Sequence, residues 1–250
     1  METENRGTGE RPGTSETQRV GTTGTGRVDT TVTETAIPAG GVELTADLVM
    51  PTDGAVGVVL FAHGSGSSRR SPRNTAVARV LHQHALATVL VDLLTPEEER
   101  VDEQTAELRF DIGLLAGRLV GGIDWLRRDP DTAALPVGLF GASTGAAAAL
   151  VAAAERPEHV PAVVSRGGRA DLAGPALSRV RAATLLLVGG QDEEVIQLNQ
   201  QARDALGGPV ELRIIPDATH LFPEPGALEQ VADQAATWFA ERLPSFGAAP

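Results

Sequence analysis

The chain has 250 residues, with 33 acidic and 21 basic side chains and a formal net charge of −12. This length suits one α/β domain with a single large core, and the acidic balance argues against a nucleic-acid partner, for which a basic surface is expected. The chain has no cysteine, which excludes disulfides, thiolate metal sites and a cysteine nucleophile. The longest apolar stretch, residues 146–154, is far shorter than the roughly 20 residues of a membrane helix. We therefore expect a cytoplasmic protein that does not bind membranes.

Both ends of the chain are poor in residues that could form a core. Residues 1–30 contain only Met1, Val20 and Val28 as large apolar side chains, among repeated Thr and Gly. Such a segment cannot bury enough surface to offset the entropy lost on ordering, so we predict that it is a disordered tail. We make the same prediction for residues 244–250. The domain is then expected to span residues 31–243.

Between these ends, short β-branched runs alternate with longer helical patterns, which is typical of βαβ units and a mainly parallel sheet. Residues 31–36 and 42–50 alternate apolar and polar side chains on either side of a Gly-Gly turn, and they predict an antiparallel hairpin at one edge. Further strands are predicted at residues 56–62, 87–93, 136–140, 161–165, 184–188 and 210–215. Helices are predicted at residues 74–84, 103–128, 144–155, 194–206 and 227–243. The expected fold class is a doubly wound α/β sheet with helices on both faces.

The turn between the strand at 136–140 and the Ala-rich helix at 144–155 carries the sequence Gly-Ala-Ser-Thr-Gly, with Ser143 at its centre. This sequence matches the pattern G-x-S-x-G, in which a sharp strand-to-helix turn exposes a serine hydroxyl and the glycines relieve crowding. The pattern is short enough to occur by chance, but a strand before it and a helix after it are the context that the pattern requires. We therefore predict that Ser143 is a nucleophile, with a structural glycine turn as the alternative.

A serine nucleophile needs a base, and the base needs an acid that holds its tautomer. On folds with this turn, the chain order is serine, then Asp or Glu, then His. Asp192 follows the strand at 184–188, and His220 follows the strand at 210–215, so both lie at the carboxyl ends of strands. Asp192 has the alternative role of capping the next helix. Glu193, Glu194 and Asp217 are the other candidates for the acid.

The first core strand ends in Ala62-His63-Gly64-Ser65-Gly66. An oxyanion hole needs two fixed N–H donors, one from the residue after the nucleophile and one from the loop that follows this strand. We assign these donors to the backbone amides of Thr144 and Ser65. For His63 we expect a loop-bracing role, because it precedes Ser143 in the chain.

With these motifs in order, the chain resembles the α/β-hydrolase superfamily, and most closely its dienelactone hydrolase-like branch, over about residues 31–243. The resemblance rests on His63-Gly64-Ser65-Gly66, the turn around Ser143, Asp192 and His220. It implies the α/β-hydrolase fold and a catalytic triad. Dienelactone hydrolases proper use a cysteine nucleophile, so Ser143 favours a carboxylester or thioester over a lactone. Domains of this branch are sometimes fused to a phosphoribosyltransferase domain, which we do not expect in this sequence.

Two loops near the predicted nucleophile carry arginines. Arg166 and Arg169 follow one strand, while Arg69, Arg70 and Arg73 follow the strand that ends at Ala62. These side chains could bind an anionic substrate group through bidentate hydrogen bonds, or they could pair with surface carboxylates. Only residues 166–183 separate two predicted strands at this edge, which is too short for a large lid. We therefore expect an open site for small or exposed acyl groups.

The sequence thus predicts a serine hydrolase that cleaves a small acyl substrate through an acyl-enzyme intermediate, without a metal or cofactor. One alternative is an acyltransferase with the same triad. The other is a non-catalytic binding module on the same fold, because a fold does not imply a function. The oligomeric state is not predicted.

Overall fold

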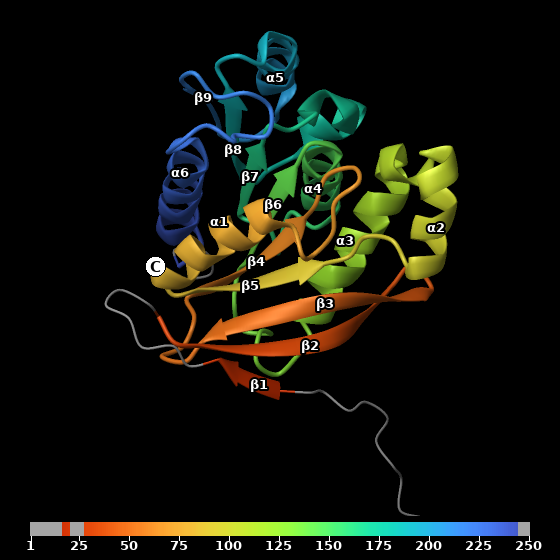
Figure 1. The fold of residues 1–250 in the computed structure, drawn as a ribbon, viewed down its shortest axis with the longest axis vertical. Helices are drawn as coiled ribbons and strands as arrows, with labels where there is room; N and C mark the ends of the chain where they lie inside the picture. The colour runs from red at the N-terminus through yellow and green to blue at the C-terminus, as the bar shows by residue number, and fades with distance from the viewer. Residues whose placement is uncertain (1–16, 21–27, 245–250) are drawn as a thin grey trace, which may run out of the picture.

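The computed structural model describes residues 17–20 and 28–244, and the strands of this part form one nine-stranded sheet (Figure 1). The strand order is β1-β2-β3-β5-β4-β6-β7-β8-β9. All neighbours from β5 to β9 pair in parallel, while β1, β2 and β3 add to the β5 edge in antiparallel fashion. The predicted fold class, a mainly parallel sheet with an antiparallel hairpin at the N-terminal edge, is confirmed.

The bounds of the elements are as follows. The strands are β1 (Thr17–Val20), β2 (Thr30–Ala39), β3 (Val42–Pro51), β4 (Gly57–Ala62), β5 (Leu86–Val91), β6 (Val137–Ala142), β7 (Ala162–Arg166), β8 (Ala183–Gly189) and β9 (Val210–Ile215). The α-helices are α1 (Pro72–Gln83), α2 (Pro96–Thr105), α3 (Ile112–Leu126), α4 (Thr144–Glu155), α5 (Glu193–Ala205) and α6 (Ala227–Arg242). Two 3₁₀ segments are η1 (Leu108–Phe110) and η2 (Ala170–Arg179).

The hairpin of β2 and β3 turns at Gly40 and Gly41, whose φ angles of 58° and 81° are both positive. Two-residue turns of this kind match the twist of antiparallel strands and favour glycine because it has no Cβ. The edge of β2 is covered by β1, which lies within the segment that the sequence predicts to be a disordered tail. A short strand can form there because edge β2 offers unpaired backbone groups. The rest of that segment, residues 1–16 and 21–27, and residues 245–250 lie outside the described part.

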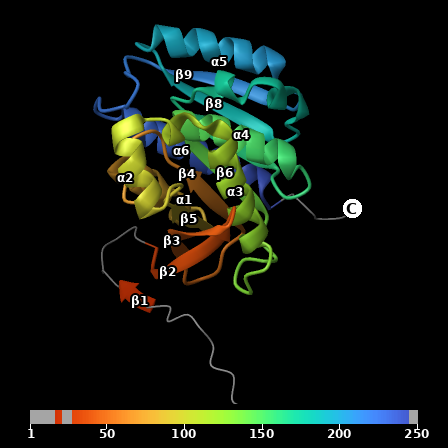
Figure 2. The ribbon, with the colours of Figure 1, turned by 90° about the vertical axis from the view of Figure 1, so that its right-hand side faces the viewer.

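Helices cover both faces of the sheet (Figures 1 and 2). Helices α1 and α6 pack on one face, and α3, α4 and α5 pack on the other. The central strands β4, β5, β6 and β7 are fully buried along their length, as expected for strands that are covered on both sides. No helix of the described residues is long and apolar enough to span a bilayer.

One predicted helix, residues 103–128, is wrong as a single element. The structure has α2 and α3 in its place, joined by η1. The break occurs at Ala106, which adopts a left-handed conformation with φ 56°. Asp111 then caps α3 by accepting a hydrogen bond from the Leu114 amide, at 2.9 Å. Helical spacing of the apolar residues continues across the break, which is why periodicity alone does not reveal it.

His82 on α1 is expected to make the stability of this fold depend on pH. Its side chain is buried, and its Nε2 lies 2.9 Å from the hydroxyl of Thr88 on β5. Burial, together with the nearby charge of Arg79, lowers the pKa of His82 to about 4. In the unfolded chain, histidine has its ordinary pKa of about 6.5.

Between these two pKa values the unfolded chain binds a proton that the folded protein does not bind. The free energy of unfolding should therefore fall by about 3 kcal/mol as the pH drops from 6.5 to 4, with the full contribution present above pH 6.5. Denaturant unfolding at pH 7 and pH 4.5 checks this. The variant His82→Gln should lose most of this dependence, whereas His84→Gln should keep it. An equally steep decline in both variants would contradict the assignment.

Candidate active site

Ser143 lies at the turn between β6 and α4, with φ 50° and ψ −124°. A positive φ is unusual for a residue other than glycine and marks a strained turn. The motif glycines permit close packing around it. A Cβ on Gly141 would lie 2.4 Å from the Ala146 Cα, and a Cβ on Gly145 would lie 2.4 Å from the Ala62 carbonyl oxygen. The turn is thus packed against the start of α4 at Gly141 and against the end of β4 at Gly145, two positions that have no room for a side chain.

Asp192 and His220 lie where the sequence analysis places them, directly beyond β8 and β9. The Nδ1 of His220 donates a hydrogen bond to Oδ2 of Asp192, with a separation of 2.6 Å. The Asp192 side chain is 17 % exposed and that of His220 is 40 % exposed. Although Asp192 occupies the N-cap position of α5, its side chain makes no capping hydrogen bond. The carboxylate is therefore free to orient the imidazole.

The other candidates for the acid are placed differently. Glu193 and Glu194 form the first turn of α5 and are exposed, and Asp217 is exposed in the turn after β9. Their carboxylates make no hydrogen bond to His220 in the described structure.

The loop after β7 connects Ser143 to His220. The backbone carbonyl of Arg166 accepts a hydrogen bond from the Ser143 amide at 3.4 Å, and the Ser143 carbonyl accepts one from the Arg169 amide at 3.1 Å. Gly167 lies between them with φ 50°, and a Cβ there would be 3.6 Å from Cε1 of His220. The imidazole therefore lies against the loop that holds the backbone of Ser143.

Ser65 in the loop after β4 meets Thr144, the first residue of α4, and their hydroxyl oxygens are 3.1 Å apart. The loop of Ser65 approaches the nucleophile closely, because a Cβ on Gly64 would lie 2.9 Å from the Ser143 Cβ. In the described part of the chain, neither the Ser65 amide nor the Thr144 amide has a hydrogen-bond acceptor. Two unpaired N–H groups beside a serine are the donors that an oxyanion hole requires.

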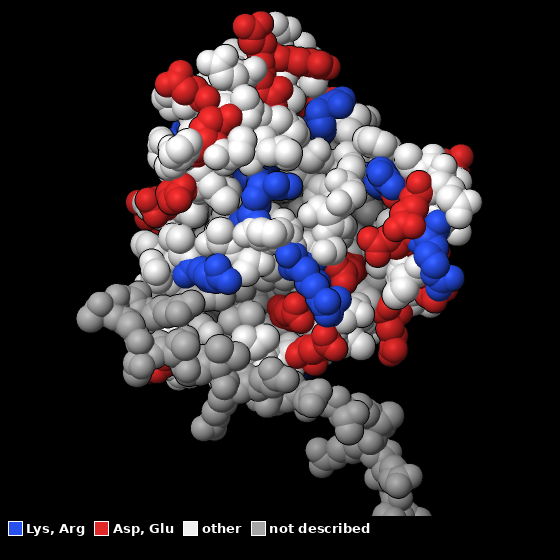
Figure 3. Space-filling model, in the orientation of Figure 1, with Lys and Arg blue, Asp and Glu red and all other residues white. Residues whose placement is uncertain are grey.

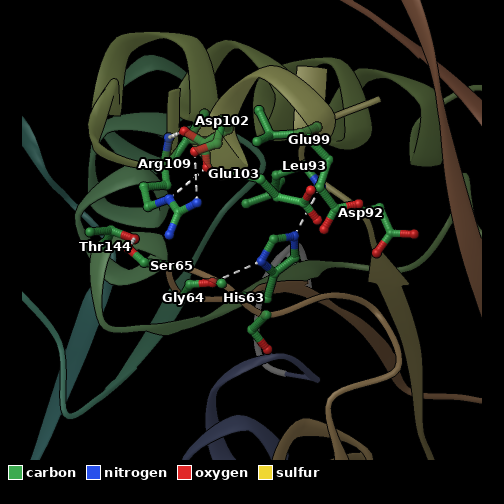
Figure 4. A pocket seen from close by; sticks show the side chains of 14 residues that line it. His63, Gly64, Ser65, Asp92, Leu93, Glu99, Asp102, Glu103, Arg109 and Thr144 are labelled. Carbon is green, nitrogen blue, oxygen red and sulfur yellow. Dashed lines mark hydrogen bonds and ion pairs between the residues drawn. The ribbon is translucent and has the colours of Figure 1, made fainter. Parts of the chain in front are cut away.

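His63 braces this loop, as expected from the sequence. Its Nδ1 lies 3.0 Å from the Gly64 carbonyl oxygen, and its Nε2 accepts a hydrogen bond from the Leu93 amide at 3.1 Å (Figure 4). Burial lowers the pKa of His63, which favours the neutral form that this acceptor role needs. His63 therefore ties the loop of Ser65 to the segment that follows β5, and both of its ring nitrogens are engaged.

A cavity of about 150 Å³ adjoins the Ser65–Thr144 pair. Figure 4 shows Arg109 on one side of it, ion-paired to Asp102 with Nε and Oδ2 2.6 Å apart. Leu93, Leu94 and Leu115 supply the apolar part of the wall. The carboxylates of the wall are those of Asp92, Glu99, Asp102 and Glu103.

Much of this wall was missed by the sequence analysis, because it comes from α2 and η1. A signal for α2 was present: Thr95, Pro96 and Glu98 form the start of a helix with a capping box. The contribution of Arg109 had no such signal, since its ion pair with Asp102 depends on the bend at Ala106.

The predicted arginine cluster divides into two groups. Arg69 is paired with Glu34, Asp47 and Asp92, and Arg169 makes a bidentate pair with Asp171. Arg69 and Arg169 thus pair with carboxylates, which is the alternative to anion binding that the sequence leaves open. Arg70 is exposed, whereas Arg166 and Arg73 each have a buried Nε without a partner in the described structure. No group of three or more potential metal ligands occurs among the described residues.

Comparison with known proteins agrees with this fold and site geometry. Residues 55–247 match the model of the Dienelactone hydrolase family. A dienelactone hydrolase from Anabaena variabilis is 60 % identical, with a TM-score of 0.83 over 85 % of this chain and 98 % of that one. Est1E from Butyrivibrio proteoclasticus shares the fold at 16 % identity, with a TM-score of 0.69 over 83 % of this chain and 98 % of its own.

The curated relatives are proteins from two strains of Mycobacterium tuberculosis that carry the provisional name phosphoribosyl transferase. They are 55 % identical over 210 residues, or 84 % of this chain. This chain spans 46 % of their length.

Proposed function

Since this chain belongs to the dienelactone hydrolase family, we propose that it is a serine hydrolase that cleaves a carboxylester, or a related thioester or lactone, through an acyl-enzyme intermediate. One observation carries the proposal: the Asp192–His220 pair lies at the carboxyl edge of the sheet, against the loop that holds the strained Ser143. A half-buried acid that orients an imidazole beside a serine is the arrangement that activates a hydroxyl.

In the proposed mechanism, Ser143 Oγ attacks the substrate carbonyl while Nε2 of His220 takes the hydroxyl proton. The amides of Ser65 and Thr144 stabilise the negative charge that develops on the carbonyl oxygen. Collapse of this intermediate breaks the bond to the leaving group, which receives the proton from His220. Water then attacks the acyl-enzyme, with His220 again accepting a proton and returning it to Ser143. Asp192 holds Nδ1–H of the imidazole throughout and stabilises the imidazolium.

The proposed substrate is a small acyl compound, and no step of this mechanism needs a cofactor or metal. A serine nucleophile and a cavity of about 150 Å³ fit a small acyl or leaving group. The proposal includes a cytoplasmic location, as expected from the sequence.

The name of the Mycobacterium tuberculosis relatives suggests a different activity. This chain spans 46 % of those proteins and the matched part carries the fold of the dienelactone hydrolase family, so we propose no phosphoribosyl transfer for this chain. An acyltransferase with the same triad is the remaining enzymatic alternative, since it needs only an acceptor other than water.

A fluorophosphonate probe tests the proposal without knowledge of the substrate, because it reacts with activated serines. We expect covalent labelling at Ser143, located by peptide mass spectrometry, and no labelling of heat-unfolded protein. Product analysis with an added alcohol or amine then separates hydrolysis from acyl transfer. A folded protein that is not labelled would favour the non-catalytic binding module.

A further inference from the structure

Arg166, the last residue of β7, is a buried arginine without an anionic partner. It is 7 % exposed, and its Nε and Nη1 have no hydrogen-bond acceptor in the described part of the chain. Burial, with a further contribution from the nearby charge of Arg73, lowers the pKa of Arg166 to about 10, so the side chain remains charged at neutral pH. A buried charge without a partner is strongly unfavourable. Such a group therefore indicates a site that an anion completes.

Arg73, in the first turn of α1, adds a second positive charge. Its Nε is also buried without an acceptor, and it forms no ion pair within the described residues. Figure 3, which has the orientation of Figure 1, shows a group of basic atoms in the middle of the visible face, near the end of α1. Mainly uncharged atoms surround this group. Since like charges repel, two unpaired arginines that are near enough to influence one another favour a ligand that carries more than one negative charge.

Arg166 lies beside the proposed nucleophile. The Arg166 carbonyl accepts the hydrogen bond from the Ser143 amide, and the next residue, Gly167, lies against His220. The preceding side chain, Ser165, faces Ala146 of α4, because a Cβ on Gly168 would meet both residues. Side chains alternate along a strand, so Arg166 points to the opposite face of the sheet, where α1 carries Arg73.

The other side of the site disfavours an anion. The cavity beside Ser65 and Thr144 is lined by Glu99 and Glu103, which have no ion pair within the described structure. A charged substrate therefore has one favourable orientation, with its anionic group toward Arg166 and away from α2.

We propose that Arg166 and Arg73 form a binding site for the phosphate group of a phosphorylated ester substrate. A phosphate monoester carries about −1.5 to −2 charges at pH 7 and three strong acceptor oxygens, which can engage both guanidinium groups. A carboxylate brings one charge and two oxygens, and it would leave one arginine unneutralised. The inference rests on the proposed hydrolase function, because it assigns the substrate class of the same site.

The test compares three 4-nitrophenyl esters with acyl chains of equal length that end in a phosphate, a carboxylate or an uncharged hydroxyl. For the wild-type protein we expect kcat/KM to be about 10- to 100-fold higher for the phosphate ester than for the uncharged one, with the carboxylate ester between them. Added salt should reduce the difference in kcat/KM between the phosphate ester and the uncharged ester. Equal values for all three esters, or a preference for the carboxylate, would overturn the inference.

Variants locate the effect. Arg166→Gln should reduce the ratio of phosphate to uncharged ester by about tenfold or more, and Arg73→Gln should reduce it by a smaller factor. Arg166→Lys should restore part of the ratio, because it keeps the charge but not the planar fork. Arg79→Gln, which removes an exposed charge from the same helix, is the matched control and should leave the ratio unchanged. If glutamine at 166 disturbs the fold, the lysine and Arg73 variants carry the comparison.

Calorimetry with inorganic phosphate separates this inference from the proposed function, because it needs no turnover. We expect wild-type protein to bind phosphate about tenfold more tightly than Arg166→Gln. Phosphate binding without fluorophosphonate labelling would contradict the hydrolase proposal and leave the anion site standing. Labelling of Ser143 with phosphate binding that Arg166→Gln does not weaken would refute the anion site alone.

Discussion

Replacement of Ser143 by alanine should lower kcat for ester hydrolysis by about 10⁴- to 10⁶-fold, as for other serines of catalytic triads. The substitution removes the hydroxyl and keeps the backbone preferences of a residue with a Cβ, so the strained conformation at φ 50° remains equally unfavourable. The Ser143 side chain makes no capping hydrogen bond to α4 that the substitution would remove. We therefore expect the thermal unfolding midpoint to stay within about 2 °C of the wild type.

Turnover of a chromogenic ester and calorimetric unfolding of the same preparation provide the measurement. Ser178→Ala is a suitable control, because the Ser178 hydroxyl lies outside the site and donates its hydrogen bond to the Pro175 carbonyl oxygen at 3.2 Å. Activity of Ser143→Ala within tenfold of the wild type would remove Ser143 from the mechanism.

The sequence predicts most of this fold because the relevant signals are local. The strand at residues 210–215 and the helix at 144–155 have the same bounds in prediction and structure, since a strong change of periodicity marks both ends. The prediction of a single helix at 103–128 is wrong because the break depends on Asp102, whose carboxylate accepts hydrogen bonds from the amide and guanidinium of Arg109. A tertiary contact of this kind leaves no trace in the spacing of apolar residues.

The same distinction applies to the candidate site. Ser143, Asp192 and His220 could be chosen from the sequence because each follows a buried strand, and parallel strands bring their carboxyl ends to one edge. Their catalytic roles remain predictions. The arginines could not be sorted in this way, because what separates Arg69 from Arg166 in function is the partners that each side chain meets. Arg69 meets three carboxylates, two of them from β2 and β3, whereas Arg166 meets none, and only the folded chain determines this.

Asp192→Asn should reduce kcat by about 10⁴-fold while leaving KM nearly unchanged. An asparagine fits the same space but can donate its amide N–H to Nδ1 of His220, which favours the tautomer whose Nε2 carries a proton and cannot accept one from serine. The fold should persist, because the Asp192 side chain does not cap α5.

Kinetics on Glu193→Gln, Glu194→Gln and Asp217→Asn complete this experiment, because these three carboxylates are the other candidates in the sequence. They are exposed and do not contact His220, so each change should alter kcat less than about threefold, as expected for surface charges. The comparison depends on position alone, since every variant removes one negative charge within a few residues of the site. If Asp192→Asn lost less than tenfold while one of the others lost far more, the hydrogen bond of 2.6 Å between Asp192 and His220 would not be the one that orients the base.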